Sequence, residues 1–194
     1  MGQPAQLAAE FQEDHVHEAE QEGLARRRDH LARRDAELGR PVERVNVRTI
    51  AAEVLGVLGI FSAAPYLEDR LGSDPHASVR VGAAHAVGRL GLPSSIPGLL
   101  QTIARDQDAD VLAAACTALG RIADPSTMPA LERAVSHPAP RVRIAAALAM
   151  ILMGSAGMAR LRLIAQQDAL GGDAAREILA RFTISVGAQP TLKD

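Results

Sequence analysis

One apolar pattern recurs four times along the chain, and this repetition limits the folds open to the sequence more than any other feature. Each copy begins with valine and has apolar residues at positions 1, 5, 8, 9 and 12, the 3.6-residue period of an amphipathic helix. The copies are VRTIAAEVLGVLG (47–59), VRVGAAHAVGRLG (79–91), VLAAACTALGRIA (111–123) and VRIAAALAMILMG (142–154). Their starts lie 32, 32 and 31 residues apart, so the sequence predicts a repeated helical unit.

A second, shorter helix is expected before each later copy. Three of these segments begin with proline, at Pro65, Pro97 and Pro129, and the last begins at Ala159. Proline is tolerated in a first helical turn, where its missing N–H would have no partner anyway. Polar segments separate the two helices of each pair, and three aspartates are expected there as turn or N-cap residues: Asp74, Asp106 and Asp110. Such pairs bury their apolar faces only by stacking on one another.

The period, the phrase VRxxAAxxLGxLG and the Asp/Pro turn resemble the HEAT-like repeats of the phycobilin (PBS) lyase type in bacterial HEAT-repeat proteins. The resemblance covers about Leu24 to Phe182. It implies an all-α fold, a right-handed α-solenoid of about five helical hairpins with the second helix of each on the concave side. The first hairpin would pair Leu24–Leu38 with Val47–Leu58, and the last second helix would be Asp173–Phe182.

Composition agrees with a helical array and suggests three segments. Aromatic residues make up only 2% of the chain, so the core must be built from Ala, Leu, Val and Ile. Residues 1–23 are expected to form an acidic N-terminal helical arm, because Pro4–Gly23 holds six acidic residues and no basic one. Residues 24–184 would form the solenoid, and residues 185–194 a flexible C-terminal tail.

The residue types needed for catalysis or metal binding do not gather in any motif. The one cysteine, Cys116, lies in an apolar run and is expected in the core, which excludes an internal disulfide and a cysteine-rich zinc site. Deoxyhypusine hydroxylases build a di-iron site from His-Glu pairs on similar repeats, but those pairs are missing from the four copies here. The sequence therefore predicts no enzyme activity, no cofactor and no metal. It also contains no apolar run long enough to cross a membrane, so we expect a cytoplasmic protein without membrane insertion.

Arginine occupies position 2 of three copies, at Arg48, Arg80 and Arg143, and Leu112 interrupts this row. A row of arginines can bind carboxylates or phosphates of a partner. We favour a structural role, in which each arginine braces a neighbouring turn and Asp74 or Asp106 accepts its hydrogen bonds.

Positions 3, 7 and 11 of each copy form a stripe expected to face outward on the concave side. This stripe is mixed in the early copies and wholly aliphatic in the fourth. An exposed aliphatic stripe marks a contact site unless the fifth unit or the C-terminal tail covers it. The candidate partner-binding residues are His85, Arg89, Arg121, Ile144, Leu148 and Leu152.

The sequence therefore favours a non-catalytic protein–protein interaction module: a scaffold, an adaptor or a regulatory subunit. One alternative is a nucleic-acid-binding protein that uses the arginines of 26–34 together with the position-2 arginines. A net charge of −2 disfavours nucleic acid. A second alternative is a cofactor-handling, lyase-like enzyme, although one tyrosine and no tryptophan leave few aromatic residues to line a bilin pocket.

Overall fold

The computed structural model describes residues 41–167 and 169–187, and their regular structure is entirely helical. The helices that contain the four copies are α2 (Pro41–Val57), α4 (Ala77–Leu90), α6 (Ala109–Ile122) and α8 (Pro140–Leu152). The shorter helices before the later copies are α3 (Ala64–Ser73), α5 (Ile96–Arg105), α7 (Met128–Ala134) and α9 (Ser155–Ala165), and α10 (Leu170–Gly187) follows last. The all-α repeat architecture predicted from the sequence is confirmed over this part of the chain.

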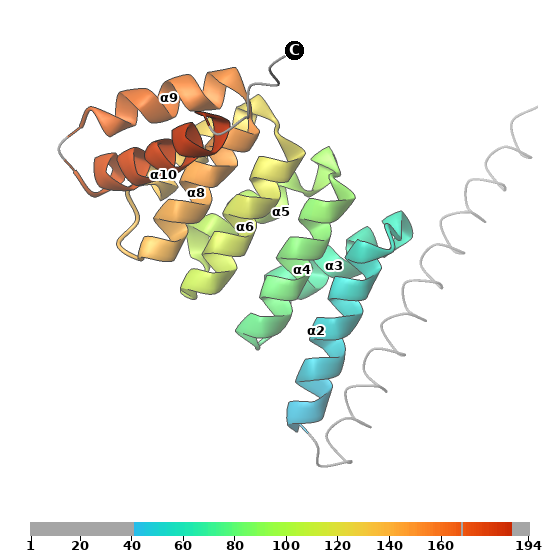
Figure 1. Cartoon of the computed structure of the whole chain (residues 1–194). Coiled ribbons are helices and arrows are strands. Elements are labelled where there is room, and N and C mark those ends of the chain that lie inside the picture. The colour runs from blue at the N-terminus through green and yellow to red at the C-terminus, as the bar shows by residue number, and fades with distance from the viewer. Residues whose placement is uncertain (1–40, 168, 188–194) are drawn as a thin grey trace, which may run out of the picture. The chain divides into compact units, whose positions relative to one another are not determined.

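The chain divides into two compact units, residues 1–44 and 45–194, and the second contains the repeats. In this unit α4, α6 and α8 pack side by side as one layer, while α3, α5 and α7 form a second layer (Figure 1). The final hairpin α9–α10 packs against α8. The expected arm 1–23 and first helix Leu24–Leu38 lie outside the described residues, as does the tail beyond Gly187. Helix α10 extends past both ends of the expected Asp173–Phe182.

Three of the shorter helices begin as their prolines predict, whereas α9 begins at Ser155, four residues before the expected Ala159. Pro65, Pro97 and Pro129 lie in the first turns of α3, α5 and α7. A short 3-10 turn precedes each of these helices: η1 (Phe61–Ala63), η2 (Pro93–Ser95) and η3 (Pro125–Thr127). The N-cap of α6 is Asp108, whose carboxylate accepts hydrogen bonds from the amides of Asp110 and Val111, so Asp110 lies inside the first turn of the helix instead of capping it.

Glycine at position 10 sets the spacing between successive long helices. A Cβ added to Gly56, Gly88 or Gly120 would lie 2.5–2.6 Å from the Cα of an alanine on the next long helix. Real carbon–carbon contacts are about 3.5–4.0 Å, so only glycine allows this approach. The alanines concerned are Ala86, Ala118 and Ala149, and all three are buried.

The core lies between the two layers and consists of aliphatic side chains. Among its largest fully buried members are one leucine from each of α3, α5, α6 and α7: Leu67, Leu99, Leu119 and Leu131. Met150 is fully buried beside them, and Cys116 is buried in α6 as its apolar surroundings predict. Each hairpin therefore contributes one face to a continuous core.

Candidate functional site

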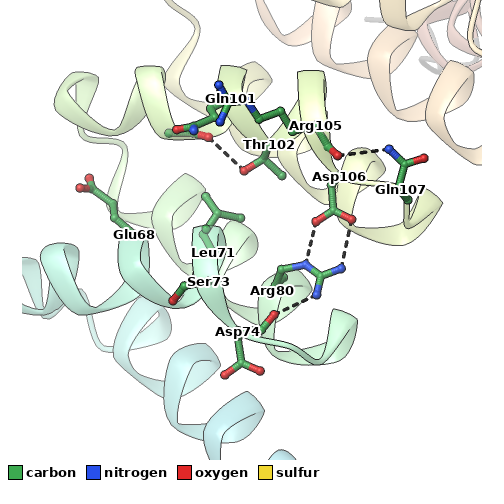
Figure 2. A pocket seen from close by; sticks show the side chains of 12 residues that line it. Glu68, Leu71, Ser73, Asp74, Arg80, Gln101, Thr102, Arg105, Asp106 and Gln107 are labelled. Atoms are coloured by element: carbon green, nitrogen blue, oxygen red, sulfur yellow. Dashed lines mark hydrogen bonds and ion pairs between the residues drawn. The ribbon is translucent and has the colours of Figure 1, made fainter. Parts of the chain in front are cut away.

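Arg80 and Asp106 link two successive repeats. The Arg80 Nε and Nη2 donate to the two carboxylate oxygens of Asp106 at 2.7 and 3.1 Å, and Nη1 donates to the Asp74 carbonyl at 2.9 Å (Figure 2). Burial alone would raise the pKa of Asp106, but the hydrogen bonds from Arg80 and from the Asp108 amide outweigh it and lower that pKa. We call this two-point Arg–Asp contact the clasp.

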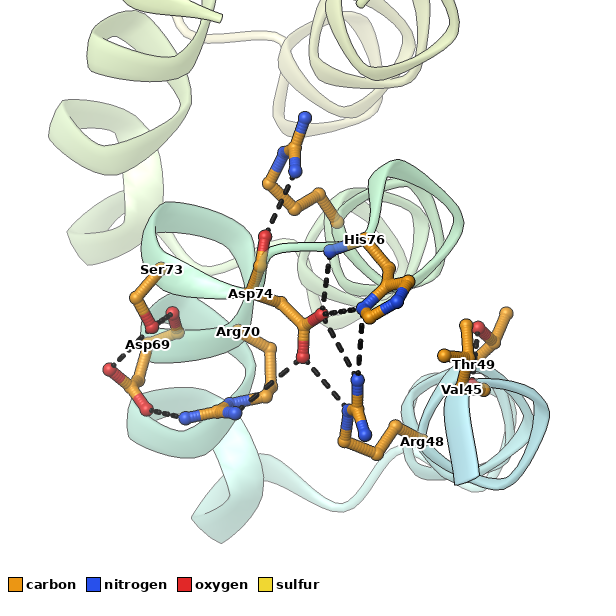
Figure 3. A network of polar contacts seen from close by, with 9 residues as sticks. Val45, Arg48, Thr49, Asp69, Arg70, Ser73, Asp74 and His76 are labelled. Carbon is orange, nitrogen blue, oxygen red and sulfur yellow. Dashed lines mark hydrogen bonds and ion pairs between the residues drawn. The ribbon is translucent and has the colours of Figure 1, made fainter. Parts of the chain in front are cut away.

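The same clasp joins Arg48 of α2 to Asp74. The Arg48 Nε donates to Asp74 Oδ2 at 3.0 Å, and the His76 amide donates to Asp74 Oδ1 at 3.0 Å (Figure 3). Arg70 adds a second cation 3.6 Å from this buried carboxylate. Burial opposes ionisation, yet the hydrogen bond from Arg48 and that from the His76 amide lower the pKa of Asp74.

The third arginine of the row braces a turn without a carboxylate. The Arg143 Nη1 donates to the His137 and Pro138 carbonyls at 3.0 and 2.7 Å. Leu112 occupies the remaining place in the row and is buried. The structure thus places all three arginines against turns, where Arg48 and Arg80 donate to aspartates and Arg143 donates through Nη1 to backbone carbonyls.

The aliphatic part of the stripe at positions 3, 7 and 11 is accessible to solvent on α8. Leu148 and Leu152 expose 46% and 57% of their surface, and Ile144 is half-buried. Hairpin α9–α10 packs against α8 but leaves both leucines accessible, so the fifth unit does not cover them.

The basic part of the stripe lies on α4 and α6. Arg89 and Arg121 are exposed, and neither forms an ion pair with a carboxylate among the described residues. Partial burial lowers the pKa of His85, and the charges of Arg89 and Arg121 lower it further, while Glu53 opposes the shift. The lowered pKa favours the neutral form of His85 at pH 7, near Arg89 and Arg121.

Helix α2 carries further exposed apolar residues that the sequence analysis did not predict. Val47, Ile50 and Val54 are all exposed, Val47 by 64%, and Val57 of the stripe at positions 3, 7 and 11 is exposed on the same helix. The corresponding valines of the next three copies, Val79, Val111 and Val142, are almost fully buried. The signal was available: Ile50 and Val54 stand where later copies have glycine or alanine.

The described residues offer no arrangement for metal chemistry. No group of three or more His, Cys, Asp or Glu side chains that could bind a metal occurs among them. The Cys116 thiol is buried, and burial raises its pKa to about 12, so a thiolate nucleophile is not available at neutral pH. In the same residues, no helix combines the length and apolar character needed to cross a membrane.

The repeats match a known protein family. The family model for HEAT repeats matches residues 43–111 and 96–180, most of the chain. The chain belongs to the HEAT-repeat family. HEAT repeats typically form scaffolds for protein–protein interaction, and the family is generally non-enzymatic. No curated protein matches this HEAT-repeat chain.

Proposed function

We propose that this HEAT-repeat protein is a non-catalytic interaction module, serving as a scaffold, adaptor or regulatory subunit. It binds a protein partner through the stripe formed by His85, Arg89, Arg121, Ile144, Leu148 and Leu152, on the face expected to be concave. The observation that carries the proposal is the exposure of Leu148 and Leu152 on a helix otherwise packed between neighbours. By its repeat phrase, we assign the chain to the phycobilin-lyase-type repeats of bacterial, cytoplasmic proteins.

The chemistry of the stripe specifies the kind of partner. Its α8 part offers aliphatic side chains, and its α4–α6 part offers two exposed arginines that form no ion pair among the described residues. A partner segment with apolar residues at one end and carboxylates at the other fits both parts. Because the helices are held by clasps and close glycine contacts, the surface is ordered before binding and little backbone entropy is lost.

The domain organisation belongs to the same proposal. We retain an acidic arm at 1–23, a solenoid at 24–184 and a tail at 185–194, with the arm as a second candidate contact. The segment 26–34, on which a nucleic-acid role would depend, lies outside the described residues. Two of the other arginines in that alternative, Arg48 and Arg80, already form clasps with aspartates.

The test compares proteins captured from the source lysate by the full chain and by folded variants. Leu148→Asp and Leu152→Asp place a charge in the stripe, while Leu163→Asp changes a leucine of similar exposure (52%) on α9, outside the stripe. We expect one partner to be captured by the wild type and by Leu163→Asp, and to be lost from both stripe variants. Circular dichroism verifies that each variant remains helical.

A second arm of the experiment tests the arginines. The charge reversal Arg89→Glu with Arg121→Glu should release the same partner, and it should not alter helicity because both side chains are exposed. Retention of that partner by all folded stripe variants would overturn the proposal. So would capture of nucleic acid in its place, with salt-sensitive retention on duplex DNA.

A further inference from the structure

Successive shorter helices enclose grooves at equivalent positions of the repeat, and these grooves differ in chemistry. One lies between α3 and α5, the next between α5 and α7, and the third between α7 and α9. None of their lining residues belongs to the partner-binding stripe proposed above. Each groove is therefore a separate surface, and the three can be compared position by position.

The α3–α5 groove is more polar than the next one, and a clasp forms part of its lining. It has a volume of about 460 Å³, and its lining includes Glu68, Gln101, Thr102 and the Arg80–Asp106 pair (Figure 2). Glu68 accepts a hydrogen bond from the Ser95 hydroxyl at 2.6 Å. The carboxylates of Glu68 and Asp106 and the guanidinium of Arg80 are therefore engaged within the fold.

The α5–α7 groove has the same position one repeat later but an apolar lining. Leu100 replaces Glu68, Leu112 replaces Arg80, and Ala134 replaces Thr102. The groove has a volume of about 280 Å³, and the other apolar residues that line it are Ile103, Ala104, Ala130 and Val142. Leu112 and Val142 are buried at its base, whereas Ala104 is exposed at its edge.

The turn beside this groove is preserved although the clasp is lost. His137 stands where the preceding turn has Asp106, and its Nδ1 accepts the Ala139 amide at 3.1 Å. Asp106 Oδ1 accepts the Asp108 amide at 2.9 Å in the same way. Both clasp partners are thus exchanged together: Leu112 replaces the arginine and His137 replaces the aspartate, while the side-chain hydrogen bond to the amide two residues later is kept. The apolar lining is a local property of this one groove.

The third groove is polar again. Glu132 occupies the position of Glu68 and Leu100, and it accepts two hydrogen bonds from Arg160 at 2.6 and 2.8 Å. The hydrogen bond from Arg160 lowers the pKa of Glu132, so this pair is charged at neutral pH. The apolar groove is therefore flanked by polar grooves on both sides.

One cation borders the apolar groove without a partner. Arg133 replaces Gln101, is exposed, and forms no ion pair with any carboxylate among the described residues. No acidic residue lines the groove, and the neighbouring Glu132 is held by Arg160. An occupant that brings a carboxylate next to an apolar group would satisfy both features.

We propose that the α5–α7 groove binds one leucine- or phenylalanine-sized side chain of a partner protein, with an adjacent acidic residue of that partner contacting Arg133. The volume supports a side chain as the occupant, because pockets for drug-sized ligands begin at about 300 Å³. The groove is a second contact site, independent of the stripe on α4, α6 and α8.

The test uses three capped tripeptides and the full-length protein labelled at its Ile, Leu and Val methyl groups. The first peptide has leucine between two glutamates, the second has leucine between two lysines, and the third has alanine between two glutamates. We expect the first to shift the Leu100, Ile103 and Leu112 methyl signals with a Kd on the order of millimolar. Lysine flanks should weaken binding about fivefold, and the alanine peptide should not bind.

Two variants convert the groove toward its polar neighbour. Leu112→Arg with His137→Asp recreates the clasp found at Arg80–Asp106, and it should abolish binding while preserving the fold. Arg133→Gln introduces the residue of the preceding repeat, and it should remove the preference for glutamate flanks without removing the preference for leucine. Neither groove variant changes a stripe residue. Peptide binding therefore reports on the groove, while loss of the captured partner in Leu148→Asp reports on the stripe.

Equal binding of the glutamate and lysine peptides by the wild type would overturn the proposal. So would undiminished binding by the folded clasp variant, or methyl shifts confined to other surfaces. If decanoate shifts these methyl signals and none of the peptides does, the groove is a site for an amphiphile and the protein-partner assignment is wrong.

Discussion

Replacing Gly88 with alanine tests how the repeats stack. The added Cβ would lie 2.6 Å from the Ala118 Cα and 2.7 Å from its Cβ, against about 3.5–4.0 Å for an ordinary contact. Because the nearest atom is backbone, α4 and α6 must separate by about 1 Å to accept it. Overpacking of this kind costs about 1–3 kcal/mol, more than the roughly 1 kcal/mol that alanine gains over glycine inside a helix. The difference between this cost and this gain should lower the free energy of unfolding of Gly88→Ala by up to about 2 kcal/mol.

Gly72 provides the matched control. It also lies in a helix, α3, but a Cβ there would meet nothing within 4 Å. Gly72→Ala should therefore raise the free energy of unfolding by about 0.5–1 kcal/mol. Urea unfolding followed by circular dichroism measures both changes. If Gly88→Ala is as stable as Gly72→Ala, the long helices are not held at glycine contact distance and close stacking through position 10 is wrong.

Three further predictions concern the clasp, one helix end and the cysteine. The lowered pKa of Asp106 means that its contribution to stability is complete above its unfolded pKa of about 3.8 and is lost as the pH falls through its folded pKa. Asp106→Asn should thus cost about 1–2 kcal/mol at pH 7, and this cost should shrink as the pH falls through the folded pKa of Asp106. Asp110→Asn, in an exposed pair with Arg141, should stay within about 0.5 kcal/mol of the wild type in urea titrations. Ala123 follows α6 at a φ of 56°, and Gly59 and Gly91 hold the equivalent positions after α2 and α4. Ala123→Gly should therefore raise the melting temperature and increase the free energy of unfolding by up to about 1 kcal/mol. The buried Cys116, with its pKa raised to about 12, should react with a thiol reagent only after unfolding; rapid reaction of the folded protein would contradict its placement in the core.

The helical pairs could be predicted because the information is local and repeated. Each long helix has the same valine and alanine positions, and each of α3, α5 and α7 has proline in its first turn. The aspartates that accept Arg48 and Arg80 could also be anticipated, since the position-2 arginine and the turn recur with the same spacing. Repetition thus reveals which contacts one repeat makes with the next.

Other features depend on differences between repeats and were not anticipated. The apolar groove arises because Leu100 and Leu112 depart from Glu68 and Arg80, and aligning the shorter helices as well as the long ones would have revealed it. Leu148 was expected to face outward, but whether the fifth unit covers it depends on where α9 and α10 pack, and the last hairpin departs from the repeat pattern. No local pattern determines that placement.

Photo-crosslinking from single positions in cells of the source organism tests the central claim most directly. A photoreactive residue at Leu152, in the stripe, is compared with one at Leu163, which has similar exposure on α9. The interaction-module account predicts a crosslink from position 152 to a specific protein, absent from position 163 and lost when Arg89 and Arg121 are both changed to glutamate. A crosslink to the same protein from position 163 but not from position 152, or to nucleic acid alone, would contradict the account.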